Sequence, residues 1–285
     1  MPVPAGPDKA SADGPPRPAR PTIEGFAQIA MFYREAVGDA GAVIECVTTL
    51  YERSRIAGNS HLYTDPYFVV QLAGGMRGSC FGFVEDAQYN VDGFIGGSAF
   101  DALSAGPDFL RVCLLDAIFE KVNRLEGLAP TRTIPYRGTA AENGQLQAQV
   151  LADLALVEAG MKVAVVGAVE DIAWVLLKRG ATPLLADFYL AGQLVGGLKV
   201  GDDARSVIKY ADAVIMTGNT LKTRTIDQLL ADATSRKTRV VVYAMSGAEV
   251  APRYLDFGAS AVTVERFPYF WYPGLGSTIS IFEHV

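Results

Sequence analysis

The sequence predicts an α/β protein in which a smaller N-terminal α+β domain precedes a Rossmann-like parallel sheet with helices on both faces. Three observations lead to this fold class. Short unbroken apolar runs such as MKVAVVG alternate with helical stretches after residue 160, as expected for parallel strands buried on both faces. Residues 67–84 have the sequence pattern of a β-hairpin, with two apolar runs joined by a glycine-rich connector. With 285 residues, half of them hydrophobic, the chain is long enough for two cores.

The N-terminal part is expected to begin after a disordered tail, because residues 1–21 are rich in proline and charge and poor in large apolar side chains. From Ile23 to about Gly58 the apolar spacing predicts helices, separated near Gly38–Gly41. The residues proposed to line one helical face are Val43, Ile44, Val47, Leu50 and Tyr51. Strands at 67–72 and 79–84 follow. We expect this domain to span residues 22–140 and the Rossmann-like domain to span 141–285.

Four helices and five strands are predicted from the remaining pattern. A helix over residues 108–127 ends at Gly127, a suitable C-cap, and a second helix over about 142–159 bridges the domains. A helix at 171–180 ends at Gly180, and Thr225–Gln228 has the spacing of a capping box. The predicted strands are the apolar runs at 161–167, 182–188, 211–220, 239–245 and 261–267. Their spacing implies parallel pairing.

Composition narrows the range of partners. A formal net charge of -6 without a dense Lys/Arg stripe argues against nucleic acid, and no apolar run is long enough to cross a membrane. Three widely spaced cysteines, Cys46, Cys80 and Cys113, fit a reducing compartment, so a cytoplasmic location is expected. Only His61 and His284 are present, which excludes a multi-histidine metal site in one chain. We expect a small molecule or a metal ion as partner and leave a homodimer open.

In an open parallel sheet the ligand lies beyond the carboxyl ends of the strands. The first such turn, GAVED from Gly167, lacks the glycines of a dinucleotide-binding loop. Asp187 ends the second strand, where a carboxylate can accept from ribose hydroxyls or can simply be solvated. The turn TGNT, with Thr217, Gly218 and Asn219, combines hydroxyl, amide and backbone groups suited to gripping a carboxylate or an amino acid moiety, although ordinary turn chemistry also explains it.

Further candidates surround this edge. Met245 ends the fourth predicted strand, and Tyr269 belongs to the aromatic segment 266–276, which either walls a pocket or packs the domain interface. Tyr63 lies near His61 in the sequence, and His61 is the best candidate for a general acid or base. The sequence does not identify the catalytic residues. Cys80 is interpreted as a core residue rather than a nucleophile. An acidic loop of Glu85, Asp86 and Asp92 either holds a hard cation or solvates the loop, and solvation is favoured.

Residues 162–267 resemble the Rossmann-like putative heavy-metal chelation domain, a domain of unknown function. The stretches that carry the resemblance are VAVVG, ADAVIMTGNTLKTRTIDQLL and DFGAS. The preceding helices, the hairpin and VCLLDAIFEKVNRL resemble the small enolase-N-terminus-like domain that usually accompanies it. The resemblance implies a site in the cleft between the two domains and a metal-chelating or metallophore-related role. The sequence departs from the family pattern at GAVED and in its aromatic C-terminal segment, which hints at a specialised ligand.

Two functions therefore stay open. The first is a protein that binds a small ligand or a metal chelate in the interdomain cleft. The second is a biosynthetic enzyme that uses an adenosine-containing cofactor such as S-adenosylmethionine on a small amino-acid-like substrate, with Asp187 on the ribose and aromatic rings facing the sulfonium. A divalent metal and S-adenosylmethionine are the corresponding cofactor candidates.

Overall fold

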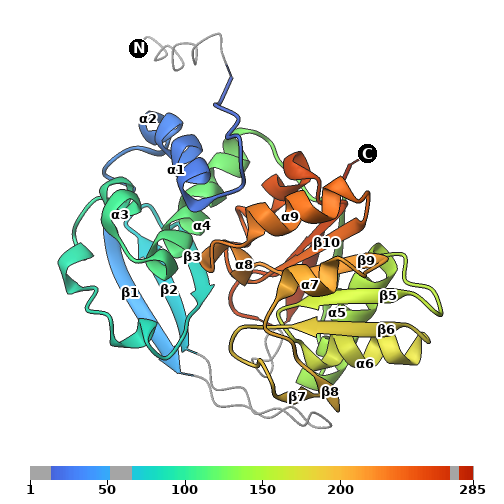
Figure 1. The fold of residues 1–285 in the computed structure, drawn as a ribbon. Coiled ribbons are helices and arrows are strands. Elements are labelled where there is room, and N and C mark those ends of the chain that lie inside the picture. The colour runs from blue at the N-terminus through green and yellow to red at the C-terminus, as the bar shows by residue number, and fades with distance from the viewer. Residues whose placement is uncertain (1–13, 52–65, 270–275, 285) are drawn as a thin grey trace.

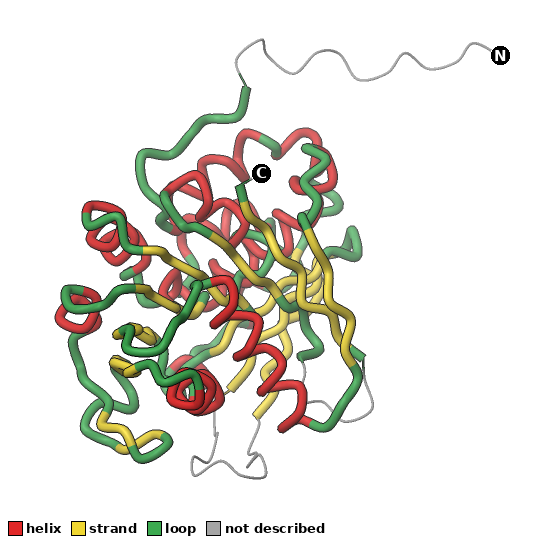
Figure 2. The backbone as a smooth tube through the Cα atoms, turned by 90° about the vertical axis from the view of Figure 1, so that its right-hand side faces the viewer, coloured by secondary structure: helices red, strands yellow, loops and turns green. Residues whose placement is uncertain are grey.

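The computed structural model describes residues 14–51, 66–269 and 276–284, which form two packed parts (Figure 1). We call the described residues of 22–128 the N-terminal unit and those of 131–284 the sheet unit. The predicted fold class is confirmed: a large, mostly parallel sheet is flanked by helices and accompanied by a smaller antiparallel sheet (Figure 2).

The N-terminal unit is an antiparallel sheet covered by helices. Its sheet has the order β1-β2-β3. Helix α4 lies directly on β3 because Gly78 has no side chain, and a Cβ there would overlap the carbonyl oxygen of Cys113. The elements are α1 (Ile23–Phe32), α2 (Arg34–Val37), β1 (Ile44–Tyr51), β2 (Pro66–Leu72), β3 (Arg77–Phe81), η1 (Asp86–Gln88), η2 (Asp92–Phe94), α3 (Ala99–Ala105) and α4 (Asp108–Leu125).

The sheet unit contains seven strands in the order β4-β12-β11-β10-β9-β5-β6. Strands β11, β10, β9, β5 and β6 are parallel, and β12 runs antiparallel to both of its neighbours. The elements are β4 (Arg132–Tyr136), α5 (Ala140–Leu154), β5 (Lys162–Val166), α6 (Glu170–Lys178), β6 (Thr182–Ala186), β7 (Leu194–Val195), β8 (Leu198–Lys199), α7 (Ala204–Ile208), β9 (Ala213–Thr217), α8 (Asn219–Lys222), α9 (Ile226–Ser235), β10 (Arg239–Ala244), η3 (Ala251–Phe257), β11 (Ala261–Val264) and β12 (Ser277–Glu283).

Alternate residues of the parallel strands enter two different cores, because successive side chains of a strand point to opposite faces. Val163 and Val165 pack with α5 and α6 on one face. Ala164 and Val166 point to the other face, which is covered by α7, α9 and η3. That second core continues without a break into the N-terminal unit, where it includes Phe119 of α4. The two units therefore share a hydrophobic core.

Two local expectations were wrong. Residues 44–51 form strand β1 rather than a helix, because the segment is rich in β-branched residues and its backbone pairs with β2. The tail up to about Pro21 stays a prediction, although Pro21 itself is buried. The capping box at 225–228 does not form, since Thr225 caps α9 without a side-chain hydrogen bond.

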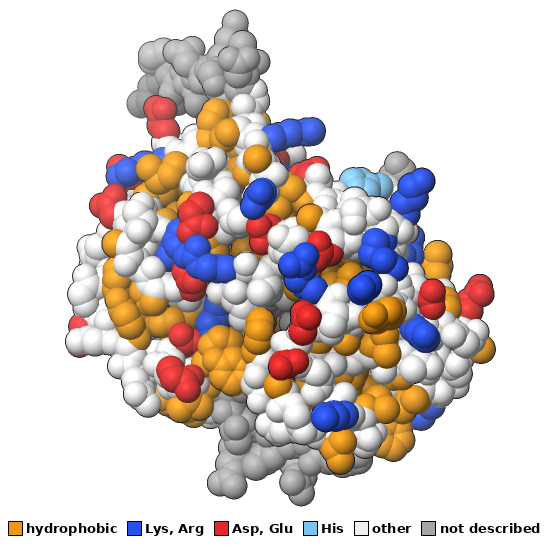
Figure 3. Space-filling view, in the orientation of Figure 1, with side chains coloured by type: hydrophobic (Ala, Val, Ile, Leu, Met, Phe, Trp, Pro, Cys, Tyr) orange, Lys and Arg blue, Asp and Glu red, His pale blue; other side chains and the backbone are white. Residues whose placement is uncertain are grey.

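The two-domain division stays a prediction, with one observation that bears on its boundary. Strand β4, which precedes the expected boundary at residue 140, pairs with β12 in the large sheet. None of the helices in the described parts of the chain is long and apolar enough to cross a membrane. On the face drawn in Figure 3, acidic and basic side chains are interspersed rather than gathered by sign.

Candidate functional site

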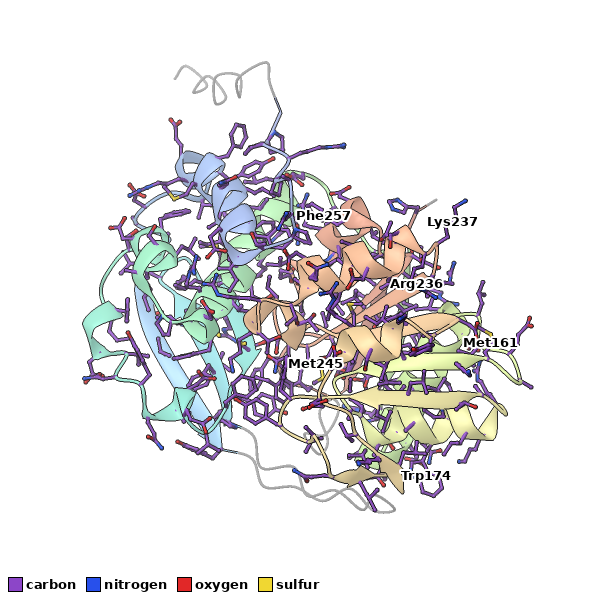
Figure 4. The ribbon with its side chains drawn as sticks, viewed as in Figure 1. Met161, Trp174, Arg236, Lys237, Met245 and Phe257 are labelled. Atoms are coloured by element: carbon purple, nitrogen blue, oxygen red, sulfur yellow. The ribbon has the colours of Figure 1, made fainter. Side chains whose placement is uncertain are left out.

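The main cavity of the described chain has a volume of about 270 Å³ and lies where the carboxyl ends of the parallel strands meet the N-terminal unit. Figure 4 labels Met245 at this junction. Six of the eight residues that the sequence suggested as ligand contacts line it: Gly167, Asp187, Thr217, Gly218, Asn219 and Met245. These residues are far apart in the chain but meet at the carboxyl ends of the parallel strands, where a ligand is expected in such a sheet.

Two of the predicted glycines are required by the packing of the strand ends themselves. Gly167 has φ +87°, and a Cβ there would lie 2.5 Å from the Oγ1 of Thr217. A Cβ on Gly218 would lie 2.5 Å from the carbonyl oxygen of Ser246. Each turn is therefore locked against the turn of the next strand, which fixes the polar wall of the cavity before any ligand arrives.

Asp187 lines the cavity, but its carboxylate already organises the surrounding backbone. Oδ1 accepts from the amides of Tyr189 at 2.8 Å and Leu190 at 3.2 Å, and Oδ2 accepts from the amide of Ala168 at 3.2 Å. A carboxylate offers about four lone-pair positions, so little acceptor capacity is left for a ribose. Asp187 is best described as the group that ties the turn after β5 to the turn after β6.

The TGNT turn contributes the least satisfied polar atom of the cavity wall. Gly218 donates its amide to the carbonyl oxygen of Tyr243 at 2.7 Å, and Thr220 Oγ1 donates to the carbonyl oxygen of Thr217, also at 2.7 Å. The side-chain Oδ1 of Asn219 is buried and accepts no hydrogen bond from the described residues. A buried acceptor in that state costs about 1–3 kcal/mol, so the wall favours a ligand that brings a donor.

The opposite wall is aromatic and comes mainly from the N-terminal unit. Tyr67 of β2 and Phe81 of β3 line the cavity, with ring centroids 3.9 Å apart. Tyr269 stacks on Phe81 at 5.7 Å and is fully buried. Its hydroxyl hydrogen-bonds to Ser79 Oγ at 2.7 Å and donates to the carbonyl oxygen of Met245 at 3.3 Å. Tyr269 thus supports the aromatic wall from behind and joins the two units.

Phe83 forms the edge of this wall and is held on both faces. Tyr189 stacks on one side, with ring centroids 3.9 Å apart, and the ammonium nitrogen of Lys222 lies 2.9 Å from the ring centre. Lys222 also forms an ion pair with Asp86, whose carboxylate accepts from the amide of Phe83 at 2.7 Å. Burial lowers the pKa of Lys222, and the charge of Asp86 opposes that shift.

A buried polar network lies behind the cavity. Gln147 of α5, which lines the cavity, donates to Glu265 Oε2 at 2.6 Å, and Tyr136 donates to Glu265 Oε1. Tyr243 also lines the cavity and contacts the sulfur of Met245. Burial, followed by the charge of Glu265, raises the pKa of Tyr243 well above its usual value, so this phenol stays protonated.

Other sequence candidates have different roles or lie outside the described residues. Tyr63 and His61 lie outside them. Asp86, expected to solvate its loop or hold a cation, is paired with Lys222. Cys80 is buried in the core, as predicted. Among the residues that the structure describes, no three His, Cys, Asp or Glu side chains are grouped to hold a metal ion.

Sequence reasoning missed the contributions of Gln147, Phe83 and Tyr189. Gln147 lies inside a helix, and Phe83 and Tyr189 lie in loops whose meeting depends on how the two units pack. The completed cavity combines a rigid polar wall, a buried unsatisfied acceptor and an aromatic wall. Such a site suits a compact ligand with an apolar face and hydrogen-bond donors.

Part of the chain is similar to a known protein family. The family DUF364, described as "Putative heavy-metal chelation", matches residues 151–264, from the end of α5 to the end of β11. The predicted resemblance of the Rossmann-like part is thereby confirmed over this range, whereas the enolase-N-terminus-like assignment of the N-terminal unit stays a prediction. No curated protein matches the chain.

Two solved structures are similar over almost the whole chain. A DUF364-family protein from Desulfitobacterium hafniense DCB-2 superposes with a TM-score of 0.57 at 12% identity, covering 90% of this chain and 99% of that one. A DUF364-family protein from Pyrococcus horikoshii gives 0.54 at 13% identity, covering 92% and 99%. At these identities the likeness concerns the fold, which includes both units.

Proposed function

We propose that this protein binds a small organic ligand, or a metal ion carried by such a ligand, in the main cavity between the two units. The observation that carries the proposal is the buried Oδ1 of Asn219, which lacks a hydrogen bond among the described residues in a cavity with an aromatic opposite wall. A ligand donor on this oxygen and an apolar ligand face on Tyr67 and Phe81 would satisfy both walls.

The donor set favours a chelate over a bare metal ion. A stable metal site needs several protein ligands, and the described residues present no group of three. A metal that arrives with an organic chelator keeps most of its ligands, and the cavity then recognises the chelator. The family description, heavy-metal chelation, supports the same direction.

The test compares carriers with their separate components. We expect at least one of the bipyridine, histidine or citrate complexes of Ni²⁺, or its free chelator, to raise the melting temperature by the amount that RT ln(1 + [L]/Kd) requires. Ni²⁺ alone should give a smaller shift. Failure of every complex and every free chelator would overturn the proposal. Stabilisation by S-adenosylmethionine alone would replace it with the cofactor-dependent alternative.

Asn219→Ala locates the binding site. Loss of one hydrogen bond to the ligand should weaken the responding probe about 10-fold in calorimetric titration. The matched control is Asn90→Ala, since Asn90 is exposed and its side chain accepts only from the amide of Asp92 among the described residues. Equal affinity of Asn219→Ala and the unaltered protein would show that the ligand lies elsewhere.

A further inference from the structure

A second cavity, of about 250 Å³, lies along the junction of the two units. Ser79 lines it and hydrogen-bonds to Tyr269, whose hydroxyl also contacts Met245 in the lining of the main cavity. The two cavities are therefore neighbours with different linings. The second is lined by charged side chains of both signs: Arg77, Asp116, Glu120, Glu249 and Arg266.

The inner end of this cavity is acidic. Asp116 of α4 is buried, and its oxygens accept from the amides of Ser79 at 2.8 Å and Glu249 at 2.7 Å. Burial, followed by the charge of Glu249, raises the pKa of Asp116 to about 8. This shift favours the protonated form of Asp116 at neutral pH.

Glu249 is a buried carboxylate that can accept a further hydrogen bond. Its side chain is only 6% exposed, and Oε2 accepts from Asn123 Nδ2 at 3.0 Å. Oε1 faces the Nε of Arg266 as an ion pair, yet it accepts no hydrogen bond of good direction from the described residues. A donor that approaches this oxygen with good hydrogen-bond geometry would therefore form a strong, charge-assisted hydrogen bond.

Arg266 is the exchangeable partner. Its side chain is 69% exposed, so its half of the ion pair is largely solvated, and such a pair contributes little to stability. The guanidinium can leave Glu249 without losing its hydration. The buried carboxylate cannot be left without a positive charge, because an uncompensated buried ion is costly.

Charge balance then selects the ligand. An amine on Glu249 would compensate the buried charge but leave the Arg266 guanidinium to solvent alone, and an anion on Arg266 would leave Glu249 buried without a cation. A zwitterion inserted between them replaces one ion pair by two. We propose that the second cavity binds a free amino acid, with its ammonium group on Glu249 and its carboxylate on Arg266.

Three further features fit this assignment. The cavity volume suits a molecule of amino-acid size. Asp116 and Glu249 are buried, whereas Arg77 and Arg266 are exposed, so the ammonium end enters first. Arg77, which also lines the cavity, adds a second positive charge for the carboxylate. This site is independent of the proposed function of the main cavity.

Thermal shift of the full chain against each of the twenty standard amino acids, followed by calorimetry on the best one, tests the proposal. We expect a zwitterion to bind, and its decarboxylated amine and its N-acetyl derivative each to bind at least 10-fold more weakly. Glu249→Gln should weaken binding by about 30-fold or more, because it removes the buried charge of the pair. Arg266→Gln should weaken it less, about 5-fold, because that side chain is exposed.

Arg124→Gln is the matched control, since Arg124 is also 69% exposed and pairs with Glu120 of the same cavity lining. It should leave amino acid binding unchanged. If no amino acid binds, if the amine alone binds equally well, or if Arg266→Gln keeps full affinity while folded, the proposal is wrong. Asn219→Ala should not affect amino acid binding, so this proposal can fail or succeed independently of the function proposed for the main cavity.

Discussion

The ammonium nitrogen of Lys222 lies against the ring of Phe83, 2.9 Å from its centre, and so joins helix α8 of the sheet unit to the loop that follows β3 of the N-terminal unit. Asp86, the first residue of the short helix η1 after that loop, supplies the counter-charge. With only 4% of the Lys222 side chain exposed, the ammonium depends on these two neighbours. The edge of the main cavity is therefore held by a charge that the protein has to compensate internally.

Removing that compensation should destabilise the protein in a pH-dependent way. In Asp86→Asn we expect the free energy of unfolding at pH 7 to fall by about 2–4 kcal/mol, because the Lys222 ammonium stays buried without its anion. Burial lowers the folded-state pKa of Lys222 below its ordinary 10.5, so the unfolded chain binds more protons in that window. Stability of the variant should therefore rise as pH increases toward 10.5. Urea unfolding measures this, with the exposed Asp92→Asn as control, and a profile parallel to that of the unaltered protein would contradict it.

Asp116 should titrate near neutrality. Its folded-state pKa of about 8 lies above the ordinary 3.8, so the folded protein binds more protons than the unfolded chain between these values. The contribution of Asp116 to stability is thus fully present below pH 3.8 and is lost as pH rises toward 8, at most at about 1.4 kcal/mol per pH unit. Carbon NMR of the carboxyl group reports its pKa directly. Glu249→Gln should lower it, because a neighbouring negative charge is removed, and an unchanged pKa would refute that cause.

Gly167→Ala should be more harmful than an alanine at another left-handed glycine. Gly167 and Gly160 have similar φ angles, +87° and +85°, but only Gly167 has a neighbour, Thr217, where a Cβ would be placed. Backbone strain should cost each variant about 1 kcal/mol, and the clash should add about 1–3 kcal/mol at Gly167 alone. Chemical denaturation of both variants gives the comparison. Equal losses would show that the turn after β5 relaxes freely.

The Ser79–Tyr269 hydrogen bond should couple the two units. Tyr269→Phe should lower the free energy of unfolding by about 1–2 kcal/mol, since Ser79 loses its buried partner. The double variant with Ser79→Ala should lose less than the sum of the two single variants. A double-mutant cycle measures the difference, and strict additivity would mean that the bond contributes nothing.

Much of the parallel sheet could be predicted from the sequence, because runs such as KVAVV are apolar on both faces and bounded by glycine. Strand β1 could not, since Ile44, Val47 and Tyr51 recur at spacings that also fit a helix. The strands β4 and β12 were missed as well. Pro135 interrupts the strand-like sequence pattern of β4. Proline has no backbone N–H, and this is tolerated because β4 lies at the edge of the sheet.

Only the wall of the candidate site that the large sheet contributes was predictable from the sequence. Strand order alone brings Gly167, Asp187 and Asn219 to one edge. The opposing wall depends on packing between units, which no local pattern encodes, so Phe83 was not found. The sequence also could not show that Asp187 is engaged by three backbone amides, because those bonds depend on turn geometry.

Strand β4 has one partner in the large sheet, β12, which is encoded almost half a chain later. During synthesis on the ribosome, β4 would emerge long before the strand that holds it in place. Its pairing must therefore await the final segment, and loop-closure entropy makes such a long-range contact a late event. A ribosome-bound chain shortened before residue 277 would carry an unpaired β4 and an open edge at β11, both suited to retention by a chaperone.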